Sequence, residues 1–313
     1  MDPETARWLR EALENMTVDL VDEMRKSIAI IIENLHQTDE GARAKITEAV
    51  DNLIDLTEDI TEAVDNLIDL TEDVNLADIF LKIGGLELLV TLFDQPPSPL
   101  YCQTGNLLAN IVQNNEEAQK IAVNNGLLEI SLKLFSRQDD KDNLRGIFAG
   151  ISALVRSSLL SQQQFVASHG FQILFDVLDR VTASAALMQE HTRFLNKANF
   201  FLSCMCQELT DEQLLAIKDC ALADKIAELA LRSSPAPPPE FLLSGLVLLL
   251  TGRRSVLLDP DAAAADTKPA VKLPLRADLK ADLSRAIENL PTADSECAVE
   301  PEVVDRLKDL LKK

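Results

Sequence analysis

The residue types that most often bind metal ions or attack substrates are scattered along this sequence. No histidine lies near a cysteine or a carboxylate cluster at the spacing of a metal site. Cys204 and Cys206 are two positions apart, so on a helix their thiols point to different sides rather than toward one ion. We therefore expect no bound metal, and we interpret the cysteines as buried, reduced thiols. The residues concerned are His36, His169, His191, Cys102, Cys204, Cys206, Cys220 and Cys297.

Motifs for cofactor binding and catalysis do not occur in the sequence either. The chain has no glycine-rich phosphate loop, no dinucleotide-binding fingerprint and no serine elbow. The acidic run at residues 139–142 resembles half of a calcium-binding loop, but it lacks the glycine and the distal glutamate of that motif. We expect no catalytic residue and no cofactor, and so we do not expect an enzyme.

A second group of polar residues is better suited to binding a protein than to catalysis. Asn114, Asn115, Arg156 and Lys197 lie at the ends of long apolar segments, at comparable points along the chain. Residues placed in this way could line one groove, and a few such residues can carry most of the energy of an interface. A solvated or helix-capping side chain would explain each of them equally well on its own.

The segments that carry these residues are predicted to be helices. Apolar residues recur at helical spacing over nearly the whole chain, as at Ile46, Ala49, Val50 and Leu53, and strand-like alternation is not sustained anywhere. Only 4% of the residues are aromatic whereas 47% are hydrophobic, which is typical of a helical protein with a sizeable core. The predicted fold class is all-α.

A short apolar helix, a small turn residue and another apolar helix recur three times, with a weaker fourth copy at residues 216–222. The turn glycines Gly85, Gly126 and Gly170 fall 41 and 44 residues apart. We expect each of them to end a helix at a positive φ. This period is typical of armadillo and HEAT repeats, and it predicts a right-handed α-solenoid of about four repeats whose longer apolar helices line a concave face.

Composition divides the chain into four segments. We expect capping helices in residues 1–45, armadillo-like repeats in 46–255, a flexible linker rich in Asp, Ala and Pro in 256–274, and a helical tail in 275–313. Residues 46–59 are repeated letter for letter at 60–73. Fourteen residues make just under four helical turns, so the second copy can extend one helix with its apolar face rotated by only about 40°.

The balance of charge excludes some partners. With 30 basic and 51 acidic residues, a net charge of −21 and no basic stripe, we expect neither nucleic acid nor an anionic membrane as a partner. The most apolar run, residues 241–250, is about half as long as a membrane span requires. Because the sequence starts without a secretory signal, we expect a cytoplasmic protein, and we expect it to be a monomer.

The amino-acid sequence of the repeats resembles one family in particular. The segments VQNN (112–115) with Gly126-Leu127 after it, GIFAGISALVR (146–156) and NKANFFL (196–202) are similar to the armadillo-class nucleotide exchange factors of 70-kDa heat-shock chaperones. This family includes the cytosolic Fes-type proteins and the animal Hsp-binding protein. The resemblance covers most of residues 1–255. At residues 74–76 this chain reads Val-Asn-Leu, where the family usually has Asp-Asn-Ala.

The resemblance implies a function and a set of contact residues. A member of this family is a co-chaperone that embraces one lobe of the chaperone's ATPase domain with its concave face and accelerates the release of ADP. The resemblance therefore implies a protein that binds another protein in the cytoplasm. The partner-binding residues expected here are Asn75, Leu76, Asn114, Asn115, Arg156 and Lys197.

An armadillo-type adaptor that binds an extended peptide, without exchange activity, is the alternative. Such an adaptor would present a regular ladder of asparagine and tryptophan side chains on its inner helices. The single tryptophan of this chain, Trp8, precedes the repeats. The sequence therefore favours the exchange factor.

Overall fold

The computed structural model describes residues 21–31, 48–94, 100–232, 240–252, 271–289 and 300–312. The chain divides into two compact units, Met1–Val155 and Arg156–Lys313. The described residues of both units form helices joined by turns and contain no strand, which confirms the all-α class. Most of the segments predicted as capping helices and as a linker lie outside the described residues.

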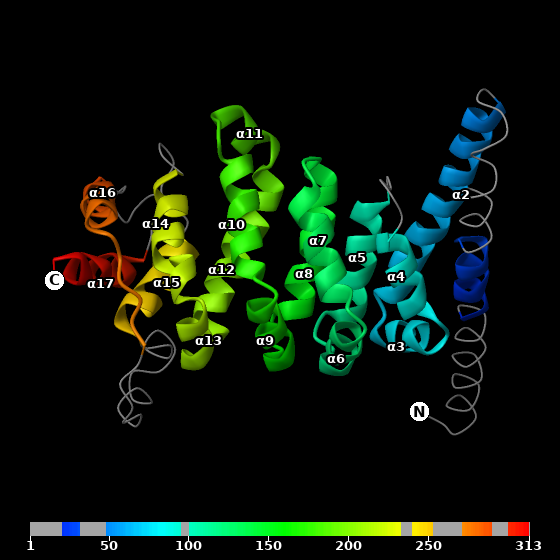
Figure 1. Ribbon diagram of the computed structural model, residues 1–313, viewed down its shortest axis with the longest axis horizontal. Coiled ribbons are helices and arrows are strands. Elements are labelled where there is room, and N and C mark those ends of the chain that lie inside the picture. Colours follow the sequence, from blue (N-terminus) through cyan, green and yellow to red (C-terminus); the bar gives the residue numbers. More distant parts are fainter. Residues whose placement is uncertain are drawn as a thin grey trace, which may run out of the picture. The chain divides into compact units, whose positions relative to one another are not determined.

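The described part of unit 1 consists of a helix over residues 21–31, the long helix α2, and two successive groups of three helices (Figure 1). Helix α2 (Glu48–Thr71) runs unbroken through both copies of the duplicated segment. Within each group the first helix is short, and α3 and α6 lie at the same edge of the unit (Figure 1). The groups are α3 (Val74–Lys82), α4 (Gly85–Asp94) and α5 (Tyr101–Val112), then α6 (Glu116–Asn124), α7 (Leu127–Arg137) and α8 (Lys141–Val155).

The described part of unit 2 continues the same pattern with two further groups and two C-terminal helices. A short additional helix, α11 (Ala185–Glu190), is inserted in the first group and buries none of its side chains. The groups are α9 (Leu159–Ala167), α10 (Gly170–Val181) and α12 (Thr192–Glu208), then α13 (Asp211–Ala216), α14 (Leu222–Arg232) and α15 (Glu240–Thr251). The C-terminal helices are α16 (Ala277–Glu288) and α17 (Pro301–Leu311).

The turn between the first and second helix of each group passes through a residue in the left-handed region. The expectation of a positive φ is confirmed for Gly126, whose φ is 77°. For Gly85 and Gly170 it is wrong by one position, because each of them is the first residue of the following helix. The residues with a positive φ at these four turns are Gly84, Gly126, His169 and Ala221.

Gly85 and Gly170 are required for space instead. A Cβ atom on Gly85 would lie 2.6 Å from Cγ of Phe80, and one on Gly170 would lie 2.6 Å from Cζ of Phe165. Carbon atoms in contact are about 3.5–4.0 Å apart, so both rings would have to move. Each glycine therefore makes room for the phenylalanine five residues earlier.

In the group that begins with α6, the small residue precedes the turn and the large residue follows it. Its residues at the two corresponding positions are Ala122 and Leu127, both buried. A small residue before the turn and a large one after it fill about the same volume as Phe80 with Gly85, and core packing tolerates such volume-conserving exchanges.

Ala221 offers a direct test of this turn geometry. Its φ of 50° and ψ of 44° lie in the left-handed region, which costs a residue with a Cβ atom about 1–2 kcal/mol. Part of the gain in Ala221→Gly is offset by the greater freedom of glycine in the unfolded chain, about 0.4–1 kcal/mol. We expect Ala221→Gly to raise the free energy of unfolding by about 0.5–1 kcal/mol in urea titrations followed by circular dichroism.

The exposed Ala281, in the middle of α16, provides the matched control. There the same substitution, Ala281→Gly, is expected to lower the free energy of unfolding by about 0.5–1 kcal/mol, because glycine is a poor helix former. Equal losses in both variants would contradict the assignment of a strained turn at Ala221.

In unit 1, the third helices of the two groups approach each other closely. A Cβ atom on Gly146 of α8 would lie 2.5 Å from Cα of Cys102 in α5, and one on Gly105 would lie 2.6 Å from the backbone nitrogen of Ile147. A Cβ atom on Gly150 would lie 2.9 Å from the backbone oxygen of Gly105. Backbone thus packs against backbone along the α5–α8 contact, which only glycines permit.

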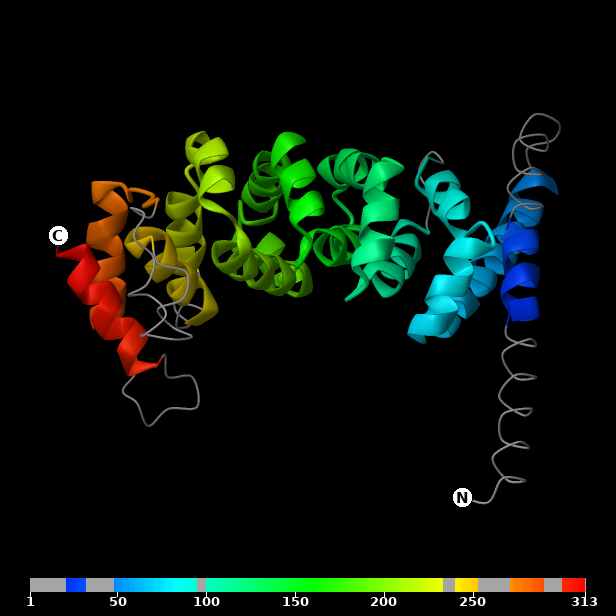
Figure 2. The same ribbon diagram turned by 90° about the horizontal axis from the view of Figure 1, so that it is seen from below.

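The C-terminal helices are part of the core of unit 2. Helix α16 packs on α14 and α17 packs on α15, and the two helices also contact each other at the C-terminal end of the unit (Figure 2). The backbone N–H of Leu273 donates to the carbonyl oxygen of Leu249, which joins the segment before α16 to α15. Residues 271–289 and 300–312 form the C-terminal segment. Its buried apolar side chains are Leu273, Leu275, Leu279, Leu283, Ile287, Val303 and Leu307.

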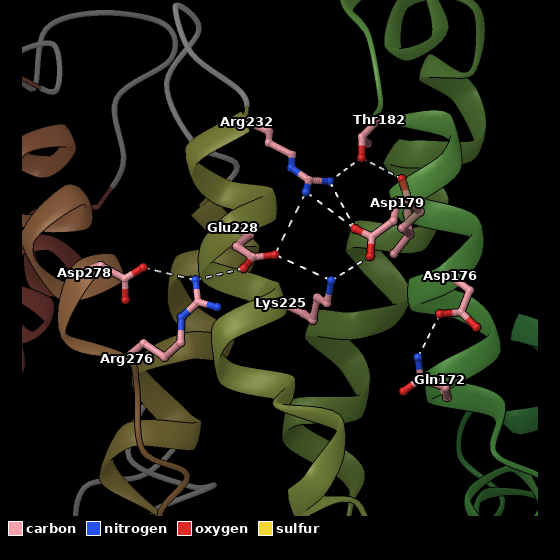
Figure 3. Close-up of polar contacts among 10 residues, drawn as sticks. Gln172, Asp176, Asp179, Thr182, Lys225, Glu228, Arg232, Arg276 and Asp278 are labelled. Atoms are coloured by element: carbon pink, nitrogen blue, oxygen red, sulfur yellow. Dashed lines mark hydrogen bonds and ion pairs between the residues drawn. The ribbon is translucent and has the colours of Figure 1, made fainter.

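Charged side chains connect the C-terminal segment to α14, and α14 to α10, on the surface (Figure 3). Lys225 of α14 lies 2.7 Å from a carboxylate oxygen of Asp179 of α10. Arg276, just before α16, lies 3.2 Å from Glu228, and its backbone N–H donates to Asp224 at 2.9 Å. These groups are partly exposed, and exposed ion pairs contribute only about 0–1 kcal/mol each. The buried leucines, more than the charges, therefore hold the segment in place.

Candidate functional site

Asn114 and Asn115 shape the turn between α5 and α6 in unit 1. Asn114 has a φ of 57° and an exposed side chain. Asn115 is the N-cap of α6, where its Oδ1 accepts a hydrogen bond from the N–H of Ala118 at 3.1 Å. Its Nδ2 donates to Oδ1 of Asp78 in α3 at 2.8 Å. Asn115 thus joins the start of α6 to the middle of α3, whereas the side chain of Asn114 is exposed.

Asn75 and Leu76 lie in the first turn of α3, and their backbone N–H groups both donate to the side chain of Asp73, the N-cap residue. The Leu76 side chain is only 7% exposed and belongs to the core of unit 1. Asn75 is exposed. Of this pair, only Asn75 offers its side chain to a partner.

Two further asparagines, on α5, are the residues most relevant to peptide binding by an armadillo-type adaptor. Asn110 donates through Nδ2 to the carbonyl oxygen of Ile68 at 3.0 Å, close to the C-terminal end of α2. The same carbonyl also accepts from Oγ1 of Thr71 at 3.1 Å, so the Asn110 side chain helps to satisfy the last turn of α2. Asn106 donates to Sγ of Cys102 at 3.9 Å. Both side chains are therefore used inside unit 1.

In unit 2, Arg156 lies over the ring of Phe200, and Lys197 lies on the same helix as that ring. The guanidinium carbon of Arg156 lies 4.9 Å from the centroid of the Phe200 ring, within the range of a cation–π interaction. Lys197 is exposed and lies three residues before Phe200 on α12, so both project from the same face of the helix. The structure thus places Arg156 against Phe200, and helix geometry places Lys197 on the same face of α12 as that ring.

Glu208, at the end of α12, holds the turn in which Arg156 lies. Its Oε2 accepts hydrogen bonds from the backbone N–H of Ser157 and from Nε2 of Gln162, both at 2.7 Å. Ser157 has a φ of 61°. No local sequence pattern marks Glu208, because the residues that it contacts lie about fifty positions earlier in the chain.

The thiols of Cys204 and Cys206 point to different sides of α12, as predicted: Cys204 is half-buried and Cys206 is buried. Burial raises the pKa of both thiols, although the nearby Arg156 opposes the shift at Cys204. Raised pKa values keep the thiols protonated, which disfavours metal binding and nucleophilic attack. Among the described residues, no group of His, Cys, Asp and Glu side chains could hold a metal ion, and no helix is long and apolar enough to cross a membrane.

Comparison with protein-family models matches residues 76–196 to the SIL1/FES1/HPBP1 C-terminal domain. The match confirms the resemblance found in the repeats. It includes Leu76, Asn114, Asn115 and Arg156, and it ends one residue before Lys197. No curated protein sequence matches the chain significantly.

Solved structures with a similar fold are armadillo-like. A designed armadillo repeat protein in complex with the peptide (KR)4 has a TM-score of 0.54 and 15% identity, over 82% of this chain and 92% of that one. An engineered protein has a TM-score of 0.58 and 17% identity over 82% and 91% of the two chains. SYS-1 has a TM-score of 0.55 and 15% identity over 92% of this chain and 48% of its own. At these identities the likeness concerns the fold alone.

Proposed function

We propose that the protein is a nucleotide exchange factor of a 70-kDa heat-shock chaperone, because residues 76–196 match the model of the SIL1/FES1/HPBP1 C-terminal domain. It acts by binding the ATPase domain of the chaperone and performs no catalysis of its own. The observation that carries this proposal is the match of residues 76–196 to the family model. In unit 2, Arg156 lies over the exposed ring of Phe200, which gives a candidate contact surface.

The proposed contact residues are Arg156 and Lys197 in unit 2 and Asn75 and Asn114 in unit 1. Their side chains are exposed or partly exposed. Leu76 and Asn115 are proposed to support the fold near these contacts, because Leu76 is buried and Asn115 caps α6.

Accelerated release of ADP follows from thermodynamic linkage. If the protein binds the nucleotide-free, open form of the ATPase domain more tightly than the closed form, it must lower the affinity for nucleotide. Nucleotide must then lower the affinity for the exchange factor by the same factor, so rebinding of ATP releases it. A tenfold change in nucleotide affinity requires about 1.4 kcal/mol of differential binding, a small part of what a standard interface supplies.

We propose that the partner is a cytoplasmic chaperone and that the exchange factor binds it as a monomer. The four cysteines in the described residues are free thiols. Free thiols are typical of proteins in a reducing compartment, which supports the cytoplasmic assignment.

The test is the release of a fluorescent ADP analogue from the purified chaperone, measured by stopped flow with and without this protein. We expect the protein to accelerate release, and we expect Arg156→Glu with Lys197→Glu to lose most of the acceleration. The control variant Lys218→Glu reverses one positive charge at an exposed lysine beyond α13, as each of the two substitutions does, and is expected to behave like the wild type. A wild-type protein that binds the chaperone without changing the release of ADP would contradict the proposal.

Such a result would favour the peptide-binding adaptor. The similar designed armadillo protein was solved in complex with a peptide, which is the observation that favours this alternative. Against it stand Asn106 and Asn110, because an asparagine ladder on α5 would need these side chains and both already bond within unit 1.

A further inference from the structure

Phe200 is an exception among the aromatic residues of unit 2. Its side chain is 48% exposed, whereas the core phenylalanines of this unit are at most 1% exposed. A phenylalanine in the core contributes about 1.5–3 kcal/mol through burial, and an exposed one forgoes most of this. The fully buried phenylalanines are Phe165, Phe171, Phe175, Phe194 and Phe201.

The exposed ring is held in place by neighbours on two sides. Arg156 stacks on its face at 4.9 Å from the centroid, and Phe241 of α15 meets it edge to face with the ring centroids 6.4 Å apart. Ordering a loose side chain on binding costs about 0.5–1.5 kcal/mol, and a ring that is already held avoids much of that cost. Phe200 is thus exposed and preorganised at the same time.

The charge on α12 around Phe200 is positive, whereas the net charge of the chain is −21. Of the 51 acidic residues, none lies between Thr192 and Gln207 on α12, whereas Arg193 and Lys197 are exposed there. Glu208, the single acidic residue of this helix, already accepts two hydrogen bonds from the turn of Arg156. The surface that α12 and Arg156 present around Phe200 is therefore basic and aromatic, and it is complementary to an apolar site rimmed by carboxylates.

We propose that Phe200 is the anchor residue of the chaperone-binding surface and inserts into an apolar pocket of the ATPase domain that is bordered by acidic side chains. This inference rests on the proposed function and adds the residue and the chemistry of the contact. Arg156 has two roles in this contact, because it contributes positive charge and holds the ring of Phe200 in place. Arginine and aromatic residues at the centre of an interface are the ones that most often dominate its binding energy.

The experiment measures the affinity of the wild type and of single variants for the chaperone's ATPase domain by calorimetry, together with the melting temperature of each variant. We expect Phe200→Ala to weaken binding by about 30-fold, the loss typical of a central anchor, while the melting temperature stays unchanged. Phe200→Trp is expected to keep most of the affinity. The matched control is Leu215→Ala, which removes an equally exposed apolar side chain (55%) from α13 and is expected to leave the affinity unchanged.

A double-mutant cycle tests the role of Arg156. If Arg156 acts partly by holding the ring, Arg156→Ala and Phe200→Ala together will weaken binding by less than the product of their separate effects. Fully multiplicative effects would overturn this part of the inference.

Other outcomes would overturn the proposal that Phe200 is an anchor residue. Phe200→Ala binding like the wild type would show that the ring is not an anchor, although the proposed function would stand. A large loss of melting temperature with unchanged affinity would assign the ring to the fold instead. A wild-type protein that forms no complex with the chaperone would overturn the proposed function together with the anchor.

Discussion

Gly146→Ala is expected to lower the free energy of unfolding by about 2 kcal/mol. A Cβ atom at this position would lie 2.5 Å from Cα of Cys102, and backbone atoms cannot turn aside as the end of a side chain can. Forcing α5 and α8 apart costs about 3 kcal/mol, at the upper end of the range for overpacked sites. The better helix propensity of alanine returns only about 1 kcal/mol. Urea unfolding followed by circular dichroism measures the difference.

Gly245→Ala is the matched control, because it makes the same change inside the third helix of the last group. There the nearest atom to the new Cβ would be Sγ of Cys206 at 3.2 Å, a side-chain atom that can move. The strain and the gain in helix propensity are expected to cancel to within about 0.5 kcal/mol. If the two variants lost the same amount of stability, the close approach of α5 and α8 would not be the cause.

Ending the chain after Gly252 is expected to lower the melting temperature by roughly 10 °C. This truncation removes α16 and α17 with their buried leucines, and it uncovers parts of α14 and α15. Each buried side chain contributes about 1.5–3 kcal/mol, and much of the sum is offset by the entropy of ordering the segment. A net loss of about 3–4 kcal/mol corresponds to a shift of roughly 10 °C in a domain of this size.

Arg276→Ala separates the buried contacts from the ion pairs of the same segment. The guanidinium is about half exposed, so we expect a loss of no more than about 1 kcal/mol. Differential scanning calorimetry of the full chain, the truncated chain and the Arg276 variant gives the comparison. A truncated protein that melts like the full chain would contradict the assignment of the C-terminal helices to the core of unit 2.

The two kinds of prediction concern different parts of the molecule. The glycine contact of unit 1 and the C-terminal helices of unit 2 are expected to affect stability, and neither includes Arg156 or Phe200. Substitutions at that surface are expected to change binding without changing stability. Measuring melting temperature and affinity for every variant therefore tests the fold and the proposed function independently.

The sequence by itself determined the features that depend on residues close together in the chain. Helical spacing predicted helices nearly everywhere, and the duplicated segment at 46–73 fitted one continuous helix because its period nearly matches whole turns. The recurring sequence motif predicted a repeat period, and its residues resembled the family whose model matches residues 76–196. These properties are local, so each segment carries its own evidence.

Only the tertiary structure decided the features that depend on what a distant segment brings alongside. Gly85 looked like a turn residue, yet it makes room for the ring of Phe80, and the neighbouring Gly84 takes the positive φ. Gly105 and Gly146 are forty-one positions apart, and nothing in either segment shows that their backbones touch. The exposure of Phe200 was equally hidden, because its own helix has apolar residues on several sides. Whether such a residue is covered depends on Arg156 and Phe241, which come from other helices of the same unit.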